Sequence, residues 1–215
     1  MSGVQQVRRR LVVAGAAGLA GVSLRAPNVL ASLLATPRQS EGPFYPPVLP
    51  RDDDNDLVRL VGADAQALGR VTHVLGRVVD REGRPLPGIL VEVWQCDANG
   101  RYLHPGDSGG RPRDPRFQGY GRTLTDAAGG YRFRTIRPVA YPGRTPHIHF
   151  KLSREGRELL TTQMYVAGEP LNERDFLLNA VRDPAARARL LVELAPAGDI
   201  EAEALAGRFE IVLPG

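Results

Sequence analysis

The stretch Pro146-His147-Ile148-His149-Phe150 places two histidines two residues apart among apolar neighbours. In a β-strand, residues two apart lie on the same face, so the two imidazoles would lie side by side. Ile148 and Phe150 would then point to the opposite face, into a hydrophobic core. We therefore expect a strand that supplies part of a core and also a chelating pair of imidazoles. The metal and the remaining ligands are open at this point.

Runs typical of strands continue on both sides of this stretch, with turns between them. The other expected strands cover residues 73–80, 88–96, 131–136, 159–166 and 208–213. An apolar stripe predicts a helix over 173–182. Asp183-Pro184 supplies an N-cap and an N1 proline for a second helix over 183–194. The pattern predicts an all-β fold, an antiparallel β-sandwich with long loops and one or two short surface helices near the C-terminus.

Several segments are expected to lie outside regular structure. Residues 36–50 are rich in proline, which excludes a helix or a central strand, so they should wrap a surface in extended form. Residues 101–121 predict a long loop, which in a compact domain is usually functional. The acidic run 52–56 lacks the spacing of a calcium-binding EF-hand loop and should be solvated. Cys96 is the only cysteine and is expected to be a buried thiol.

Residues 1–35 are predicted to be a targeting segment. Arg8-Arg9-Arg10 precedes fourteen uncharged residues, Leu11 to Leu24, a run too short and too weakly apolar for a comfortable transmembrane helix. The pattern resembles a twin-arginine export signal, so we expect a periplasmic, secreted or N-terminally anchored protein. An amphipathic or disordered extension is the alternative, and the cleavage site is left open. Residues 36–215 should form one domain.

The basic character of the chain comes from its N-terminus. The chain has 28 basic and 24 acidic residues, and the four arginines within residues 1–35 account for the difference. The remainder is formally neutral and has no basic stripe, which excludes a nucleic-acid footprint. Contact with a membrane is expected only through an uncleaved export signal, and a homo-oligomer is left open.

Two loop tyrosines are the notable candidates to complete a metal site with the histidine pair. Tyr102 and Tyr141 each lie beside turn residues in loops that flank the expected core. Phenolate is a hard anionic donor that prefers ferric iron to zinc. Ionising a tyrosine at pH 7 costs roughly 4 kcal/mol, so only a strongly Lewis-acidic metal would hold two. A cupin site is disfavoured, because Glu155 is too far along and no later histidine follows His149.

These motifs together resemble the intradiol ring-cleavage dioxygenases, the family of protocatechuate 3,4-dioxygenase and catechol 1,2-dioxygenase. The resemblance covers about residues 36–178, with the motifs in order along the chain. The matching pieces are residues 36–45, 87–88, 91–95, Gly100-Arg101-Tyr102, 121–126, 131–138, Tyr141-Pro142, 144–150 and 162–165. The combination of Gly-Arg-Tyr, Tyr-Pro and His-Ile-His is more specific than any single piece.

The resemblance implies a non-haem enzyme with one Fe(III) that inserts both atoms of O2 into a catechol-type substrate. The ring would open between the two hydroxyl-bearing carbons to give a cis,cis-muconate-type product. Tyr141 would leave the iron when substrate arrives and take up a substrate proton, while Arg144 would stabilise negative charge. The implied metal ligands are Tyr102, Tyr141, His147 and His149; the implied catalytic residues are Tyr141, Arg144 and Gln163; the implied substrate-binding residues are Gly42, Pro43, Phe44 and Arg144.

The chain also departs from the family pattern. Gly143 stands where better-known members carry an aromatic residue, and the stretch from Tyr141 to His147 is shorter than theirs. The roof of the pocket should therefore be smaller or more open, and the substrate cannot be named. The alternative is an exported transthyretin-like or carboxypeptidase-regulatory-like binding module without catalysis, which residues 76–88 and 125–133 resemble. Such modules lack the ligand set.

Overall fold

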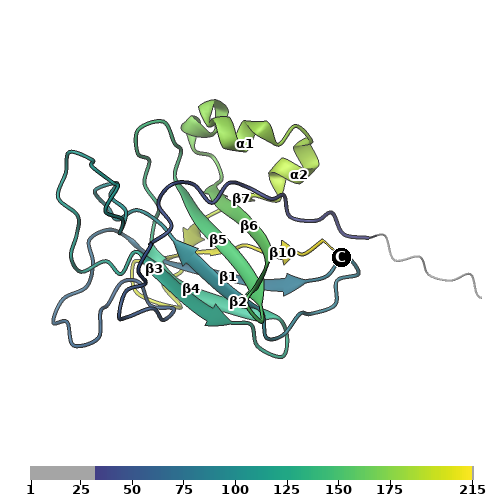
Figure 1. Ribbon diagram of the computed structural model, residues 1–215, viewed down its shortest axis with the longest axis horizontal. Helices are drawn as coiled ribbons and strands as arrows, with labels where there is room; N and C mark the ends of the chain where they lie inside the picture. Colours follow the sequence, from purple (N-terminus) through teal and green to yellow (C-terminus); the bar gives the residue numbers. More distant parts are fainter. Residues whose placement is uncertain (1–31, 215) are drawn as a thin grey trace, which may run out of the picture. The chain divides into compact units, whose positions relative to one another are not determined.

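The computed structural model describes residues 32–214, and two five-stranded β-sheets form their framework (Figure 1). The first sheet contains β1 (Val71–Val79), β4 (Gly130–Ile136), β8 (Ala195–Pro196), β9 (Leu205–Arg208) and β10 (Ile211–Val212). The second sheet runs in the order β3 (Tyr120–Leu124), β2 (Leu90–Trp94), β5 (His147–Arg154), β6 (Arg157–Val166) and β7 (Leu191–Val192). The predicted β-sandwich is confirmed.

Successive side chains of β5 point alternately into the core between the sheets and to the opposite face, which carries the histidines. Ile148 and Phe150 are buried between the sheets, and the Phe150 ring centroid lies 6.4 Å from that of Phe133 on β4. His147 and His149 occupy the intervening positions and so lie on the opposite face. That face is also covered, because the two histidines are only 1% and 2% exposed.

Strand pairing is mostly antiparallel, and it places one row of side chains across the second sheet. β5 lies between β2 and β6, and the register pairs His149 with Trp94 on one side and with Gln163 on the other. Paired residues point to the same face, so these three side chains lie in a row. Three short parallel pairs, β1 with β9, β1 with β10 and β6 with β7, extend the sheets with late segments of the chain.

The proline-rich segment is extended and crosses the second sheet, as predicted. The N–H of Gln39 donates to the carbonyl of Thr161 at 2.8 Å, and the hydroxyl of Thr162 donates to the carbonyl of Pro37 at 2.7 Å. Both partners belong to β6. Figure 1 shows this segment in purple, crossing β5 and β6. The segment therefore helps to cover the face on which the histidines lie.

The helices are shorter than the sequence indicated. The predicted helix over 173–182 is instead a 3-10 turn, η1 (Pro170–Arg174), followed by α1 (Phe176–Ala180), because the extended backbone of Asp175 separates them. The second helix, α2 (Pro184–Ala188), ends well before residue 194, since the chain then pairs with β6 as β7. The predicted final strand over 208–213 is observed as the last residue of β9, Arg208, and as β10, and the ladder is interrupted at Phe209 and Glu210.

The described residues, 32–214, include no helix that could cross a membrane. The predicted export segment, residues 1–35, lies almost wholly outside them and stays a prediction, as does the assignment of residues 36–215 to one domain.

Candidate active site

Three donor atoms from two parts of the chain meet on the covered face of the second sheet. Nε2 of His147 lies 3.2 Å from Nε2 of His149. Oη of Tyr102, from the loop between β2 and β3, lies 3.4 Å from the first and 3.2 Å from the second. Nitrogen and oxygen ligands about 2 Å from a single ion are roughly 3 Å from one another. The spacing of this triangle therefore fits one metal ion.

Both histidines are in the neutral form that binds a metal. Nδ1 of His147 lies 2.6 Å from the carbonyl oxygen of Thr145, which can only accept, so this nitrogen carries the proton. Burial, and next the nearby Arg144, lower the pKa of His147 to about 4, so Nε2 keeps its lone pair at neutral pH. Burial also lowers the pKa of His149 well below the usual value. A cation at the point of convergence would satisfy these lone pairs.

Tyr141 lies beside the triangle, in the loop between β4 and β5. Its ring centroid is 5.5 Å from the ring centroid of Tyr102 and 5.5 Å from that of His147. Burial raises the pKa of both tyrosines, and for Tyr141 the guanidinium of Arg144 acts in the opposite direction. A phenolate in such a place needs a highly charged hard cation beside it. Within residues 32–214, no third His, Cys, Asp or Glu is gathered with the histidine pair.

The stacking of Trp94 fixes His149 from one side. The rings of Trp94 and His149 lie 4.8 Å apart between centroids and only 9° from parallel. Gly42 approaches His149 from the extended segment, where a Cβ would lie 3.3 Å from Cε1 of the imidazole. The φ of Gly42 is +74°, in the left-handed region that favours glycine. His149 is therefore held between the sheet and the extended segment.

Arg144 is buried and is held by three side chains. Its Nε donates to Oδ2 of Asp175 at 2.8 Å, and its Nη2 donates to Oε1 of Gln163 at 2.6 Å and to Oη of Tyr165 at 3.3 Å. Nε2 of Gln163 donates to the carbonyl of Ser40 at 2.8 Å. Both ends of the Gln163 amide are thus engaged, so this residue acts on the site through Arg144.

Comparison with known proteins identifies the family. Residues 40–215 match the family model described as "Dioxygenase", which is well over half of the chain. The chain is also 42% identical over 184 residues to the protocatechuate 3,4-dioxygenase beta chain of Burkholderia cepacia, a match that covers 80% of this chain and 77% of that one. The chain belongs to the intradiol ring-cleavage dioxygenase family. The predicted family and ring-cleaving function are confirmed, and the non-catalytic alternative is disfavoured.

Other members of the intradiol dioxygenase family agree with this assignment. The dioxygenase domain of a dioxygenase and carbohydrate-binding protein fusion from Streptomyces sp. SirexAA-E is 36% identical, with a TM-score of 0.64 over 84% of this chain and 98% of that one. Catechol 1,2-dioxygenase of Candida albicans is 33% identical over 162 residues, or 66% of this chain and 50% of that one. The chain spans about half the length of the catechol and hydroxyquinol 1,2-dioxygenases it matches.

The residues implied to bind substrate in this intradiol dioxygenase are only partly gathered at the site. Phe44 stacks on Tyr102, with ring centroids 4.9 Å apart, and meets Tyr141 edge-on at 6.4 Å. Gly42 lies against His149, as described above. Pro43, between them, is exposed. Phe44 and Gly42 therefore border the predicted ligands, whereas Pro43 faces solvent.

A cavity of about 230 Å³ lies directly beside Tyr141 and Arg144 in this dioxygenase. Gly143 and Leu171 also line it, and a Cβ at Gly143 would meet no atom within 4 Å. The exposed Gly143 therefore leaves the roof of this cavity open.

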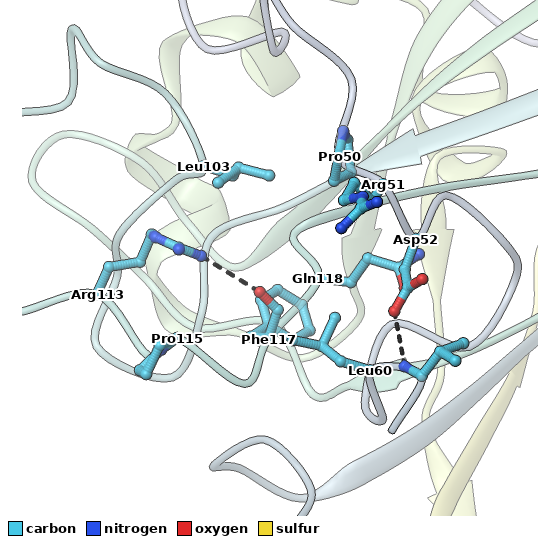
Figure 2. Close-up of a pocket in the computed structure, with 10 residues that line it drawn as sticks. Pro50, Arg51, Asp52, Leu60, Leu103, Arg113, Pro115, Phe117 and Gln118 are labelled. Carbon is cyan, nitrogen blue, oxygen red and sulfur yellow. Dashed lines mark hydrogen bonds between the residues drawn. The ribbon is translucent and has the colours of Figure 1, made fainter. Parts of the chain in front are cut away.

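A second cavity, of about 470 Å³, is lined in part by residues of the loop that carries Tyr102 (Figure 2). Leu103 lines it, and Nη1 of Arg113 donates to the carbonyl of Phe117 at 3.3 Å across its wall, as Figure 2 shows. None of the four predicted metal ligands lines this cavity. Tyr141 lines the smaller cavity and also a further cavity of about 410 Å³, and of these two only the smaller one is lined by Arg144 as well.

Three residues that shape this site are not among the predicted site residues: Trp94, Tyr165 and Asp175. Trp94 lies in residues 91–95, which match the family, but its contact with His149 depends on strand register. Tyr165 lies in the matching piece 162–165 without a predicted role, and Asp175 falls within the predicted helix over 173–182. A carboxylate that follows a helical turn and precedes apolar residues does signal an N-cap, but nothing in the sequence couples Asp175 to Arg144.

Proposed function

We propose that this dioxygenase opens the ring of a catechol-type substrate between its two hydroxyl-bearing carbons and inserts both atoms of O2. The observation that carries the proposal is the triangle of donor atoms from Tyr102, His147 and His149, at 3.2–3.4 Å from one another. The adjoining cavity, lined by Tyr141 and Arg144, offers a place for the substrate. The named relatives act on protocatechuate, catechol or hydroxyquinol, which supports the class of substrate without selecting one.

We also propose that Tyr102, Tyr141, His147 and His149 hold one mononuclear non-haem Fe(III). Two neutral imidazoles and two phenols suit a hard trivalent cation, whose charge would offset the cost of ionising buried tyrosines. When bound, the iron would supply Lewis-acid chemistry that favours the ionised catechol and activates it toward O2. The fit rests on the convergence of the donor atoms described above.

The two tyrosines differ in a way that suits different roles. Tyr102 is 2% exposed and stacks against Phe44, whereas Tyr141 is half-buried and lines the cavity. Tyr141 is thus the one with room to move aside for substrate, and its Oη can take up a proton from a catechol hydroxyl. The guanidinium of Arg144, at the same cavity, would stabilise negative charge that develops on the substrate.

Oxygen uptake by iron-loaded protein tests this function. The panel is catechol, protocatechuate, hydroxyquinol and substituted catechols, and the products are analysed by mass after reaction with ¹⁸O₂. We expect uptake with at least one substrate, two labelled atoms in its product, and loss of uptake in Tyr102→Phe and His147→Ala. His104→Ala serves as a control, because His104 lies outside the triangle. Unchanged uptake in Tyr102→Phe would reject its role as a ligand.

We further propose that residues 1–35 direct twin-arginine export. The support is the arginine run Arg8-Arg9-Arg10 ahead of a weakly apolar stretch. Export in the folded state would let the chain acquire iron before it meets competing metals.

A further inference from the structure

We propose that Asp175 is a positioning residue for ring cleavage, whose buried carboxylate holds Arg144 so that one edge of its guanidinium stays available to the substrate cavity. The proposal rests on the proposed function, because both concern the same site. Asp175 lies outside every sequence motif that led to the family. It reaches the site only because η1 ends beside the loop that precedes β5.

The hydrogen bonds of Arg144 show which edge of the guanidinium remains available. A guanidinium has five N–H groups in a rigid plane. The single N–H of Nε is used by Asp175, and the two of Nη2 are used by Gln163 and Tyr165. Nη1 is engaged by none of these three side chains, and Arg144 lines the cavity together with Tyr141, whose phenol is its neighbour there. The Nη1 edge is therefore the one that can meet a substrate oxygen.

The carboxylate of Asp175 is fully engaged and holds two segments together. Its Oδ2 accepts from Nε of Arg144 at 2.8 Å and from the N–H of Thr145 at 3.1 Å. Its Oδ1 accepts from the N–H groups of Leu177 and Leu178 at 3.1 and 3.0 Å. One oxygen thus caps α1, while the other fixes the loop that carries Arg144. The two side chains of the ion pair are 0% and 8% exposed.

Capping alone does not explain a carboxylate in this position. Asp183 caps α2 with one hydrogen bond, to the N–H of Ala185, and is exposed. A buried ion pair adds little net stability, because desolvation offsets the attraction between the charges. Its clear effect is geometric, since charge-assisted hydrogen bonds fix the plane of the guanidinium. Among residues 32–214, Asp175 is the only carboxylate that pairs with Arg144.

Asp175→Asn, with Asp183→Asn as the matched control, separates these roles. An asparagine at position 175 can keep the cap with its oxygen, but its NH2 group would then face the N–H groups of Arg144 and Thr145. We expect kcat/KM of the iron-loaded protein for its best catechol to fall at least about tenfold in Asp175→Asn. It should stay within about twofold of wild type in Asp183→Asn. An Asp175→Asn protein that folds and keeps wild-type kcat/KM would overturn the proposal.

A double-mutant cycle shows whether Asp175 acts through Arg144. In an Arg144→Gln background, adding Asp175→Asn should change kcat/KM by less than about twofold, because the group it positions is already gone. If the two substitutions instead lower kcat/KM by independent factors that multiply in the double mutant, Asp175 has a merely structural role. If Asp175→Asn alone does not fold, Asp175→Glu takes its place in the cycle, since it keeps the charge and moves it by one methylene.

A separate measurement distinguishes failure of this inference from failure of the proposed function. If wild-type protein consumes no O2 with any catechol, the proposed function fails. The ion pair is then tested by the NMR signal of the Arg144 Nε–H in the same protein. This proton should exchange with solvent at least about tenfold faster in Asp175→Asn than in wild type. Equal exchange rates would show that Asp175 does not hold the guanidinium.

Discussion

Replacing Gly42 with alanine should weaken the metal site far more than it weakens the fold. The φ of Gly42 is +74°, and an alanine in this region costs about 1–2 kcal/mol. In a domain of this size, each 1 kcal/mol lowers Tm by roughly 2–4 °C, so we expect a fall of about 2–8 °C. Strain of this kind acts on the backbone and by itself leaves the side chains of the site in place.

The second effect of the substitution reaches His149 directly. The new Cβ would lie 3.3 Å from Cε1 of His149, closer than the roughly 3.5–4.0 Å of a favourable carbon contact. The imidazole has little room to retreat, because Trp94 stacks on it at 4.8 Å. A shift of a few tenths of an ångström exceeds the tolerance of a metal site, about 0.2 Å. We therefore expect iron affinity to fall by about tenfold or more.

Gly156→Ala is the matched control for this prediction. Gly156 has a similar φ of +77°, but a Cβ there would meet no atom within 4 Å. Thermal unfolding of both apo variants should show similar losses in Tm. Chelator competition, followed by iron content and by fluorescence of Trp94, the only tryptophan, should show weaker iron binding in Gly42→Ala alone. Equal iron affinities in the two variants would refute the packing argument for His149.

Two further predictions concern acid stability and export. A hydrogen bond from Arg134 is the main cause that lowers the pKa of Glu201 from 4.5 to about 2. This carboxylate therefore stabilises the fold above about pH 5, and the contribution disappears as the pH falls toward 2. Between about pH 5 and pH 2, the free energy of unfolding should fall by roughly 1–2 kcal/mol less in Glu201→Gln than in wild type, a figure that allows for the partial exposure of Glu201. If chemical denaturation gives both proteins the same pH profile, this prediction is wrong. A reporter fused to residues 1–40 should be exported only with Arg8 and Arg9 intact, and export that survives Arg8→Lys/Arg9→Lys would remove the twin-arginine assignment.

The strands β1, β2, β4, β5 and β6 were predictable because their pattern is local, whereas β3 begins inside the loop predicted over 101–121. Residues 131–134 alternate between apolar and polar side chains, and β4 covers this run. The apolar stripe of 173–182 was misleading, since a 3-10 turn and a short helix can present the same stripe as one longer helix. The parallel pairing of Leu191–Val192 with β6 is a tertiary contact, and no periodicity in those two residues could indicate it.

The proposed metal ligands were predictable from motifs, but the residues that pack around them were not predicted to have such roles. The spacing of His147 and His149 indicates a chelating pair, and the neighbours of Tyr102 and Tyr141 in the sequence indicate these two tyrosines as further candidates. Away from the site, His73 is 1% exposed and hydrogen-bonded to Glu201. These two residues are 128 positions apart, and only the folded chain brings them together.

The visible absorption spectrum of the iron-loaded protein tests the ferric site most directly. With one iron bound per chain, phenolate ligands from Tyr102 and Tyr141 should give a burgundy protein through charge transfer from tyrosinate to Fe(III). Tyr102→Phe with the same iron content should lose much of that colour. A colourless protein that holds one ferric ion per chain would contradict the assignment of the tyrosines as ligands.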